Sequence, residues 1–309
     1  MKLSVALATY NGAEFIEEQL ESIRKQTMPV DEVIICDDQS KDSTVEVVKS
    51  YIQKNALEDS WKISVNEKNK GYASNFIGAA DLTSGDLIFF CDQDDIWVED
   101  RVERMVLQMQ NNPKIKVLGS EFKPFTVDDD APSVPGWEMK MMKYDDSLEY
   151  IEYVPKHIAI GCQGCTMCIR KTFYNEIRPY WYTGWAHDEF VWKLALCARG
   201  LYMYHVATLK RRLHSNNVTM HKMRDVAKRI KFLEDLLLSH KATLKYAKDS
   251  SMNEKEQMLL KRNIKATELR IELLKNKKYT NTIPLLFKYA DCYHKSRAIL
   301  VELYMAIKA

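Results

Sequence analysis

The sequence lacks any apolar run close to the roughly 18 residues that a helix needs to cross a bilayer. Its start, Met1 to Ala6, has no long apolar stretch ahead of a small-residue cleavage site, so it favours a first strand over a secretory leader. The seven cysteines are an odd number spread over 309 residues, which argues against a disulfide framework and for a reducing compartment. We therefore expect a cytoplasmic protein, with peripheral contact at the inner face of the membrane left open.

The chain also has little net charge, only +2, but that charge is unevenly distributed. Residues 221–309 carry 20 Lys and Arg against 10 Asp and Glu, whereas residues 1–220 carry 25 against 33. An acidic front part and a basic back part indicate regions with different partners, although a solvated, Lys-rich helical region explains the pattern equally well. We expect no nucleic acid among those partners.

Within the first 120 residues, short apolar runs alternate with helical patterns. The runs are rich in β-branched and aromatic residues and lie at Leu3–Ala8, Val33–Cys36, Ile63–Val65, Leu87–Cys91 and Ile115–Gly119. Helical patterns separate them near residues 13–26, 42–54, 72–81 and 99–111. This alternation predicts an α/β fold whose sheet is rich in parallel strands and covered by helices on both faces.

The pattern changes along the rest of the chain. Residues 121–155 contain Pro124, Pro132, Pro135 and a run of aspartates, which predicts an irregular loop over the site. Residues 187–189 open a further helix, predicted over Phe190–Ala198. Beyond about residue 222 the pattern is purely helical, with one apolar stripe from Val226 to Leu244, a second from Leu260 to Leu274, and a third helix predicted over Ile283–Ile307. We expect a basic bundle that either joins subunits or docks on a membrane surface.

Polar residues follow the first four predicted strands, and ligands of open α/β sheets bind outside the carboxyl ends of the strands. The segments concerned are Thr9–Gly12, Asp37–Ser40, Asn66–Gly71 and Asp92–Asp95. Two of them carry adjacent carboxylates, which repel each other unless a cation or ligand compensates. The D-x-D pattern of Asp92 and Asp94 is suited to one hard cation, Mg²⁺ or Mn²⁺. An Asp-rich turn that caps the following helix is the plainer interpretation.

Several of these motifs resemble a known family. Ala8–Gly12, Ile35–Asp42 and Gly85–Asp86 ahead of Asp92–Asp95 are similar to family 2 glycosyltransferases, which are inverting enzymes of the GT-A fold, a Rossmann-like mixed sheet flanked by helices. Cys165–Met167, His187–Asp188 and His214–Asn217 extend the likeness to about residue 219, toward a bacterial surface-polysaccharide branch described as rhamnosyltransferase-like. We accordingly expect a catalytic domain over 1–220, with a donor half (1–100) and an acceptor half (101–220), and an all-helical C-terminal appendage at 221–309.

The resemblance implies a site for a nucleoside-diphosphate sugar. Asp92 would contact the ribose, Asp94 and His214 would hold Mn²⁺ or Mg²⁺, and Asp188 would be the general base, with its neighbour Glu189 as the alternative. The donor would also meet Thr9, Tyr10, Asn11, Asp38, Asn69, Gly71, Asn75, Gln93 and Arg212.

Two further stretches suggest contacts with the acceptor. Gln163, Gly164 and Thr166 belong to a segment of small residues, where a backbone can approach a substrate. The cysteines of this segment, Cys162, Cys165 and Cys168, lack a fourth ligand at a spacing typical of zinc, although Cys197 is available in principle. The aromatic stretch that ends at Trp185, just before His187, suits sugar stacking, although core packing uses such residues as well. We therefore assign the acceptor to Gln163, Gly164, Thr166, Trp185 and His187.

Together these patterns predict transfer of a sugar to a hydroxyl of a glycan, glycolipid or glycoprotein in bacterial surface-glycan synthesis. Such an inverting transfer needs a carboxylate base and no covalent nucleophile, which agrees with the absence of a Ser-His or Cys-His signature. A sugar-phosphate nucleotidyltransferase would call for a Gly-rich loop with Arg after the first strand, and Ala8–Gly12 is not one. A degenerate carbohydrate-binding or scaffold protein is the alternative that is not an enzyme.

Overall fold

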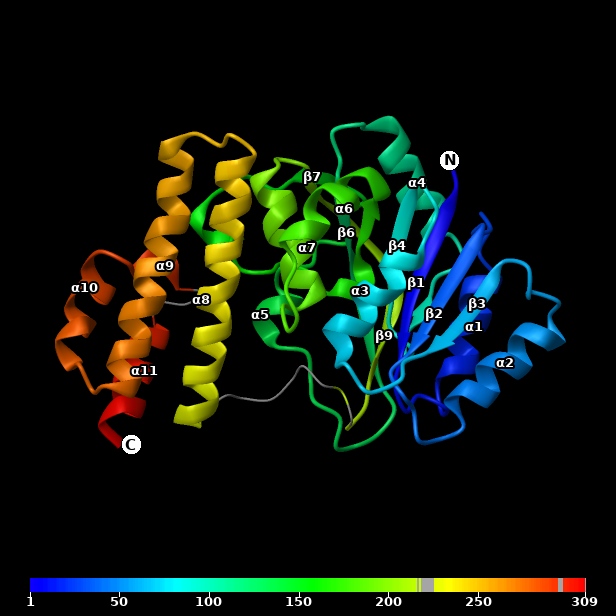
Figure 1. Cartoon of the computed structure of the whole chain (residues 1–309), viewed down its shortest axis with the longest axis horizontal. Coiled ribbons are helices and arrows are strands. Elements are labelled where there is room, and N and C mark those ends of the chain that lie inside the picture. The colour runs from blue at the N-terminus through cyan, green and yellow to red at the C-terminus, as the bar shows by residue number, and fades with distance from the viewer. Residues whose placement is uncertain (216, 218–224, 294–296, 309) are drawn as a thin grey trace.

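A computed structural model of the chain describes residues 1–215, 217, 225–293 and 297–308 (Figure 1). Within these residues, nine strands form one mixed sheet in the order β3-β2-β1-β4-β8-β6-β9-β5, with β7 paired to β9. The expected mixed sheet flanked by helices is thus confirmed. The strands are β1 (Leu3–Thr9), β2 (Glu32–Asp37), β3 (Trp61–Val65), β4 (Leu87–Cys91), β5 (Ile96–Trp97), β6 (Val117–Thr126), β7 (Leu148–Tyr150), β8 (Cys168–Arg170) and β9 (Leu201–Leu213).

Strand β1 shows why both faces of the sheet are covered. Leu3, Val5 and Leu7 enter one hydrophobic core, whereas Ala6 and Ala8 enter the core on the opposite face, because successive side chains of a strand alternate. Every residue of β1 is buried, as is typical of a central parallel strand. Because β1 lies parallel to β2 and β4, and β2 to β3, the carboxyl ends of these four strands meet at one edge.

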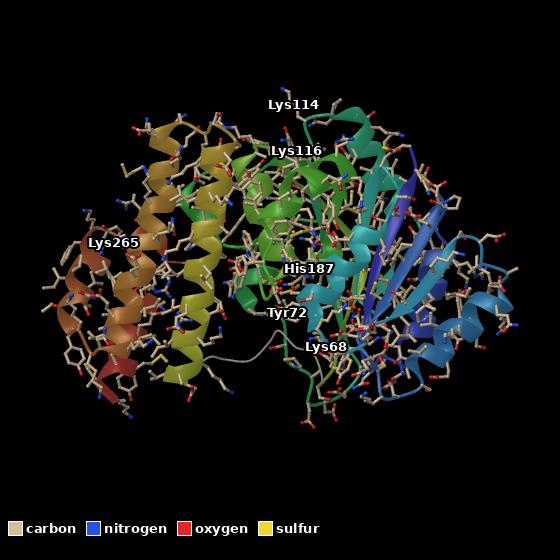
Figure 2. All side chains as sticks on the ribbon, viewed as in Figure 1. Lys68, Tyr72, Lys114, Lys116, His187 and Lys265 are labelled. Atoms are coloured by element: carbon tan, nitrogen blue, oxygen red, sulfur yellow. The ribbon has the colours of Figure 1, made fainter. Side chains whose placement is uncertain are left out.

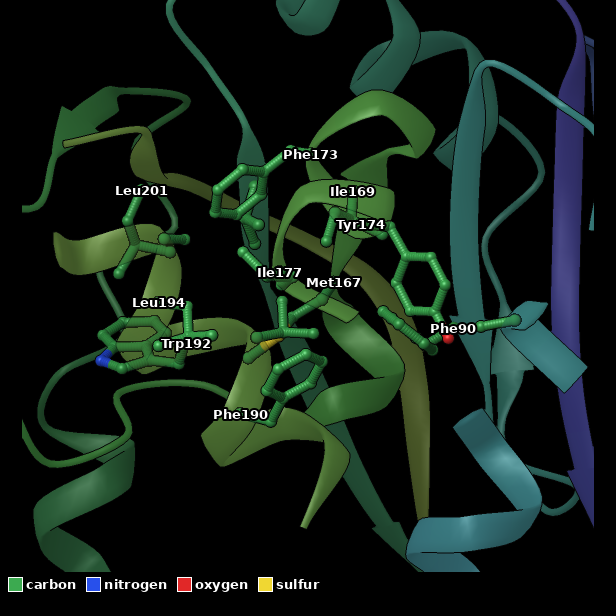
Figure 3. Close-up of a cluster of buried hydrophobic side chains, with 14 of the residues drawn as sticks. Phe90, Met167, Ile169, Phe173, Tyr174, Ile177, Phe190, Trp192, Leu194 and Leu201 are labelled. Atoms are coloured by element: carbon green, nitrogen blue, oxygen red, sulfur yellow. The ribbon is translucent and has the colours of Figure 1, made fainter. Parts of the chain in front are cut away.

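Helices cover each face of the sheet close to the predicted positions. On the face of Leu3 lie α1 (Ile16–Arg24), α2 (Thr44–Lys54) and α4 (Arg101–Asn111). On the face of Ala6 lie α3 (Tyr72–Leu82), α6 (Lys171–Ile177) and α7 (His187–Cys197). Figure 3 shows side chains of α6 and α7 packed against those of β4 and β8. Short 3₁₀ turns connect several elements, at Pro155–His157, Gly164–Thr166, Arg178–Tyr180, Tyr279–Asn281 and Ala290–Cys292.

The prediction of an irregular segment over residues 121–155 is wrong in part. Strand β6 continues to Thr126, and the segment also contains α5 (Gly136–Met139) and β7. Pro124 is tolerated because β8 pairs only with Val117 and Leu118 of β6. Beyond that point, among the residues that the structure describes, β6 pairs with β9 alone and its other edge is open. A strand of this kind has no alternating pattern that the sequence could have displayed.

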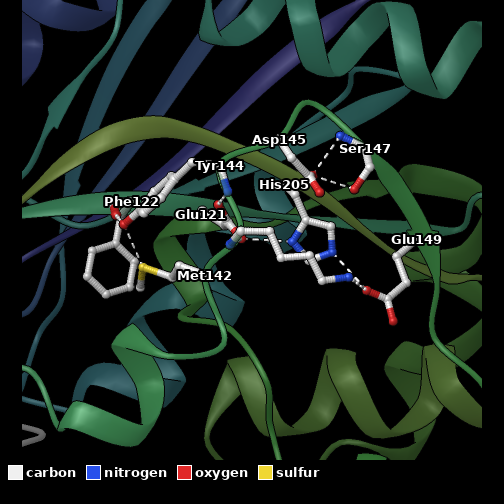
Figure 4. Close-up of polar contacts among 9 residues, drawn as sticks. Glu121, Phe122, Met142, Tyr144, Asp145, Ser147, Glu149 and His205 are labelled. Carbon is white, nitrogen blue, oxygen red and sulfur yellow. Dashed lines mark hydrogen bonds and ion pairs between the residues drawn. The ribbon is translucent and has the colours of Figure 1, made fainter.

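A buried histidine fastens this segment to the sheet (Figure 4). His205 of β9 bonds Oε1 of Glu121 through Nδ1 at 2.7 Å and Oε2 of Glu149 through Nε2 at 2.8 Å. The Glu121 carboxylate also accepts the backbone N–H groups of Lys143 and Tyr144, at 2.7 and 2.9 Å. The loop between α5 and β7 is thereby held against β6 and β9.

The chain continues into α8 (Val226–Asp249) and α9 (Glu254–Lys275), two long helices that lie side by side (Figure 1). Asp225 and Asn253 cap their first turns, accepting the N–H groups of Lys228 and Glu256 at 2.7 and 3.0 Å. Their apolar stripes are buried or half-buried within the chain: Leu233 and Leu274 pack into a core with the last helices, and Leu260 joins the core of the main sheet.

The single third helix predicted over Ile283–Ile307 is wrong. The chain instead forms α10 (Thr282–Phe287) and α11 (Arg297–Lys308). Tyr289 and Tyr293 turn inward between them and join the core of the helical region, which draws the backbone out of a continuous helix. Asn216 and the predicted boundary between residues 220 and 221 lie outside the described residues. No helix in the described part of the chain has both the length and the apolar character needed to cross a bilayer.

Candidate active site

The loops that follow β1 and β2 are tied together by their own polar side chains. Thr9 Oγ1 donates to Asp37 Oδ2 at 2.8 Å, and the other oxygen of Asp37 accepts the N–H of Ser40 at 2.8 Å. Asn11 has a positive φ of 49°. It donates its N–H to Ser40 Oγ and accepts the N–H of Lys41 with its side chain, at 2.8 and 2.7 Å. The turn after β1, which is the first segment predicted to bind the sugar donor, is therefore rigid.

Gln93, in the loop after β4, forms two hydrogen bonds to the same turn. Its Oε1 accepts the N–H of Tyr10 at 2.8 Å and its Nε2 donates to the carbonyl of Tyr10 at 3.0 Å. A Cβ at Gly12 would lie 2.2 Å from that Oε1, so only glycine lets the amide approach. The Tyr10 ring itself is 45% exposed at the mouth of the site.

Asp38 organises the loop after β3. Its carboxylate accepts the N–H of Lys70 at 2.8 Å, the N–H of Gly71 at 2.8 Å and the amide of Asn66 at 2.9 Å, while Asn69 donates to its carbonyl at 3.1 Å. Gly71 has a φ of 81°, which favours glycine at the start of α3. These contacts make Asp38 an anchor for the loop that carries Asn69 and Gly71.

Asn75 of α3 connects the loop to the sheet beneath it. Its Nδ2 donates to the carbonyls of Thr9 and Cys36, at 3.2 and 2.7 Å, and its Oδ1 accepts from Asn66 at 2.9 Å. The Asn75 side chain is buried and its amide N–H and carbonyl groups are all hydrogen-bonded. It therefore holds the loops that are predicted to bind the sugar donor against the sheet.

The half-buried Asp92 forms an acidic group with the buried Asp95 and Cys165 after β4. One ligand atom from each lies within 4.8 Å of the others, and this is the one group of three possible metal ligands among the described residues. Burial raises the pKa of Asp92 well above its usual range and that of Asp95 to about 7, and the neighbouring charge of Asp94 raises both further. Close carboxylates of this kind are suited to a divalent cation, which would relieve their repulsion.

Asp94 meets the end of β9. Its Oδ2 lies 2.8 Å from His214 Nε2 and 3.5 Å from the amide of Asn217, and within the described residues the other ring nitrogen of His214 has no partner. A carboxylate and an imidazole at this distance fit Mn²⁺, and less closely Mg²⁺, which takes oxygen ligands almost alone. Asp94 and His214, the two ligands predicted from the sequence, therefore lie in direct contact, and the group of Asp92, Asp95 and Cys165 is a second possible ligand set.

The two arginines at the end of β9 differ in surroundings. Arg212 donates to the carbonyl of Asp94 at 2.8 Å and pairs with Glu18, while its guanidinium lies 4.7 Å from the ring centroid of Phe15. Arg211 instead stabilises the charged forms of Asp92, Asp95 and Asp188 through its own charge. The sequence assigned the donor to Arg212, but the electrostatic link between the acidic group and the expected base is Arg211.

Asp188 and Glu189 open α7, and the structure distinguishes them. Glu189 pairs with Lys193 and accepts the hydroxyl of Ser239 on α8 at 2.8 Å. Asp188 accepts the N–H of Glu189 at 2.7 Å and its own backbone N–H, and pairs with no side-chain cation among the described residues. Burial raises the pKa of Asp188 to about 6. Of the two carboxylates, Asp188 is the one with lone pairs left for a substrate.

The Glu189–Lys193 pair predicts a large effect on stability. Lys193 is 2% exposed, and Lys193→Met would leave Glu189 without its cation, so we expect a loss of about 3 kcal/mol in the free energy of unfolding. The control is Lys231→Met, because Lys231 forms a pair with Asp235, also four residues apart, that is exposed to solvent and should contribute little to stability. Urea unfolding of both variants measures this; equal losses would contradict the prediction.

His187 lies between aromatic rings beside Gly164. Its ring stacks on Phe76 with centroids 3.9 Å apart and lies 5.4 Å from Phe90. Burial lowers its pKa to about 3, so the imidazole is neutral, and neither ring nitrogen has a partner among the described residues. A neutral, buried imidazole with free nitrogens is suited to a substrate hydroxyl.

Gly164→Ala tests this arrangement. An added Cβ would lie 2.2 Å from Nε2 of His187, whose ring is fixed by its stacking partner, so the ring would have to move. We expect a cost of about 1–3 kcal/mol in stability and a clear loss of activity. Gly136→Ala is the control, since a Cβ at Gly136 has nothing within 4 Å. Thermal unfolding and kcat/KM of the two variants decide; similar values for both would contradict the prediction.

The side chains of the other residues predicted to bind the acceptor make contacts within the protein. Gln163 donates to Glu138 of α5 at 2.6 Å, and Thr166 bonds the carbonyl of Gln163 at 2.7 Å, so these side chains are used locally. Trp185 is 1% exposed and packs between Tyr182 and Phe190, so in this structure its ring belongs to the core.

The sequence reasoning missed Tyr72, the first residue of α3. Half of this residue is exposed, and Asp188 and Glu189 act electrostatically on its hydroxyl. Figure 2 shows it below His187, on the side of the molecule where the strands end. Tyr72 directly follows Gly71, the residue that has a positive φ. This position next to a residue of the predicted site is the signal that could have revealed Tyr72.

Known proteins resemble this chain in sequence and in fold. Residues 4–176 match the model of glycosyl transferase family 2. The chain is 32% identical over 110 residues to the Escherichia coli UDP-Glc:alpha-D-GlcNAc-diphosphoundecaprenol beta-1,3-glucosyltransferase WfgD, covering 36% of this chain and 42% of that protein. It is 38% identical over 103 residues to the Shigella flexneri dTDP-rhamnosyl transferase RfbG, covering 32% and 35%. The crystal structure of residues 1–349 of S. aureus TarS with UDP-GlcNAc superposes with a TM-score of 0.67 at 18% identity, over 99% of this chain and 90% of that one.

Proposed function

The chain belongs to glycosyl transferase family 2, and from this premise we propose that it transfers a sugar from a nucleoside-diphosphate sugar to a hydroxyl of a bacterial surface glycan, glycolipid or glycoprotein. The two partly matching relatives support this, because their names specify nucleotide-sugar donors, and one specifies a diphosphoundecaprenol-linked acceptor. Such an acceptor would place the protein at the cytoplasmic face of the membrane.

One observation carries the proposal. The charge of Arg211 acts both on Asp92 and Asp95, where a donor would bind, and on Asp188, where an acceptor would be deprotonated. A donor site and a base are therefore within electrostatic reach of one guanidinium, which suits a diphosphate between them. A binding protein without catalysis has no need of a base with a raised pKa at this position.

The residues suggest the following division of work. The nucleotide would lie on the turn of Thr9 to Asn11, beside the loop that Asp38 and Asn75 hold, with its ribose at Asp92 and its diphosphate near Arg211. Asp94 and His214 would hold Mn²⁺ or Mg²⁺, which when bound supplies positive charge to the diphosphate leaving group.

Asp188 would take the proton of the acceptor hydroxyl as its oxygen attacks the anomeric carbon. The bond to the diphosphate breaks on the opposite face of the sugar, so the anomeric configuration inverts. With a pKa of about 6, the Asp188 carboxylate is mostly ionised at neutral pH and is a stronger base than an ordinary aspartate. His187, free at both ring nitrogens, would accept or donate a hydrogen bond to a sugar hydroxyl beside Gly164.

Calorimetric titration with UDP-, dTDP- and GDP-linked sugars tests the donor site. We expect one of these families to bind with micromolar affinity when Mn²⁺ or Mg²⁺ is present, and at least about tenfold more weakly after EDTA treatment. If no nucleotide sugar binds under either condition, the proposal fails.

A further inference from the structure

The last two helices expose a set of large apolar side chains that the proposed function does not explain. Helix α11 is apolar on two sides: Ile299, Met305 and Ala306 are buried in the helical core, while other apolar residues face outward. Together with two residues of α10 they form a surface that we call the C-terminal apolar face. Its members, each at least 55% exposed, are Ile283, Phe287, Leu300, Val301, Tyr304 and Ile307.

Helical spacing places these residues together. Leu300, Val301, Tyr304 and Ile307 follow the i, i+1, i+4, i+7 pattern of one helix face. In α10 the buried residues are Thr282 and Leu285, whereas Ile283 and Phe287 face outward from a helix that contacts α11. Phe287 is 86% exposed, the largest value among the exposed large apolar residues described. A helix that is apolar on both sides is normally covered on both sides.

The charges around the face are almost all positive. Residues 275–308 contain seven Lys and Arg and two acidic residues. Both acids are used within the chain: Asp291 pairs with Arg262 at 2.7 Å, and the buried Glu302 pairs with Arg270 at 2.7 Å. Lys288, Arg297 and Lys308 are exposed beside the apolar residues, and the ammonium of Lys308 lies 5.1 Å from the ring centroid of Tyr304.

Apolar side chains surrounded by Lys, with aromatic rings beside the charges, are suited to the interface of an anionic bilayer. We propose that the C-terminal apolar face inserts into the headgroup region of an anionic membrane, and that Lys288, Arg297 and Lys308 contact lipid phosphates. A second copy of the chain is a poorer occupant, because pairing the face with itself would bring like charges together. Each basic residue near an anionic surface contributes roughly tenfold or less to binding.

The position of the face agrees with an acceptor in the membrane. In Figure 1 the C-terminal end of α11 and the carboxyl ends of β1 and β2 are both at the lower side of the molecule. A membrane at that side would meet the end of α11, where Ile307 and Lys308 lie, and the carboxyl ends of these strands. The proposal concerns binding to lipid and does not require that the chain transfer a sugar.

Sedimentation of the full chain with lipid vesicles tests the proposal. We expect binding to vesicles of phosphatidylcholine mixed with phosphatidylglycerol that is at least about tenfold stronger than binding to phosphatidylcholine alone, and that weakens as salt is raised. The triple variant Phe287→Ser, Val301→Ser, Ile307→Ser should lose most of this binding. The double variant Lys288→Glu, Lys308→Glu should lose the preference for anionic vesicles.

A matched control is the triple variant Leu82→Ser, Leu107→Ser, Leu238→Ser, which removes equally exposed apolar residues elsewhere and should bind as the parent does. Circular dichroism and binding of the soluble donor should be unchanged in all three variants, which separates this proposal from the proposed function. Equal sedimentation of parent and Phe287 triple variant would overturn it. So would light scattering that shows a dimer of the parent and a monomer of that variant, since the face would then join two subunits.

Discussion

Asp188→Asn is expected to lower kcat about 1,000-fold while the affinity for the donor changes little, because the asparagine amide keeps the size of the side chain but cannot take a proton. The loss should appear in kcat and kcat/KM alike, as for a group that acts in the transition state. Calorimetric titration of the donor and steady-state rates with a saturating acceptor measure the two effects separately.

Glu189→Gln is the matched control, since the two carboxylates are neighbours. A glutamine keeps an oxygen for the Ser239 hydroxyl, so we expect the variant to keep most of the activity, with some loss of stability from the Lys193 pair. An inactive Glu189→Gln beside an active Asp188→Asn would move the base to Glu189.

The pH dependence of kcat/KM should report the same group. Burial raises the pKa of Asp188 from 3.8 to about 6, so the carboxylate is present above that pH and is lost as the pH falls through it. Activity should therefore rise between about pH 5 and 7 and then level off, with a value at pH 5 about tenfold below the plateau. An ordinary aspartate would leave the rate flat over this range.

Asp94→Asn is the second large effect that we expect. Loss of the charge of a metal ligand should weaken Mn²⁺ binding by at least about 100-fold. Replacing a residue that only hydrogen-bonds to a metal ligand already lowers metal affinity about 10- to 100-fold. Donor affinity in the presence of Mn²⁺ should fall with it, toward that of the parent in EDTA. Paramagnetic resonance of free Mn²⁺, with and without donor, measures the ion directly.

Two further variants sharpen the metal assignment. Asp59→Asn removes an exposed carboxylate just before the amino end of β3, at the edge of the sheet opposite the carboxyl ends of the parallel strands, and should bind Mn²⁺ as the parent does. Asp95→Asn removes a member of the acidic group with Asp92 and Cys165. If Asp95→Asn abolishes Mn²⁺ binding and Asp94→Asn leaves it intact, the ion belongs to that acidic group and our assignment of Asp94 and His214 is wrong.

The sequence was sufficient for the front half of the fold because the pattern there is local. Buried parallel strands are short apolar runs, and the polar segments after Thr9, Asp37 and Cys91 follow the ends of those runs directly. The edge at which they meet follows from the parallel order of the strands. Fold class and candidate loops could therefore be predicted together.

The partners of individual side chains could not be predicted in this way. Asp38 is held by backbone N–H groups of Lys70 and Gly71, about thirty residues away in sequence, and Glu189 by Ser239 on α8. No periodicity records such contacts. The same limit applies to Trp185, where the sequence leaves sugar stacking and core packing equally open and the structure buries the ring.

The C-terminal helices show a different limit. Stripes of apolar residues predicted α8 and α9 well, but inward turns of Tyr289 and Tyr293 interrupt the expected third helix. Apolar spacing in 283–307 does not distinguish residues that enter the core from those that face outward, since α11 carries both kinds. The exposed set could be recognised only once the helices were packed.

The account as a whole depends on turnover of a sugar nucleotide, and one assay measures it most directly. Release of nucleoside diphosphate from UDP-, dTDP- and GDP-sugars should be seen with Mn²⁺ or Mg²⁺ for at least one donor, should stop in EDTA, and should fall about 1,000-fold in Asp188→Asn. Proton NMR of the product should show the anomeric configuration opposite to that of the donor. Release of pyrophosphate from a nucleoside triphosphate and sugar phosphate, or no turnover of any donor with either ion, would contradict the account.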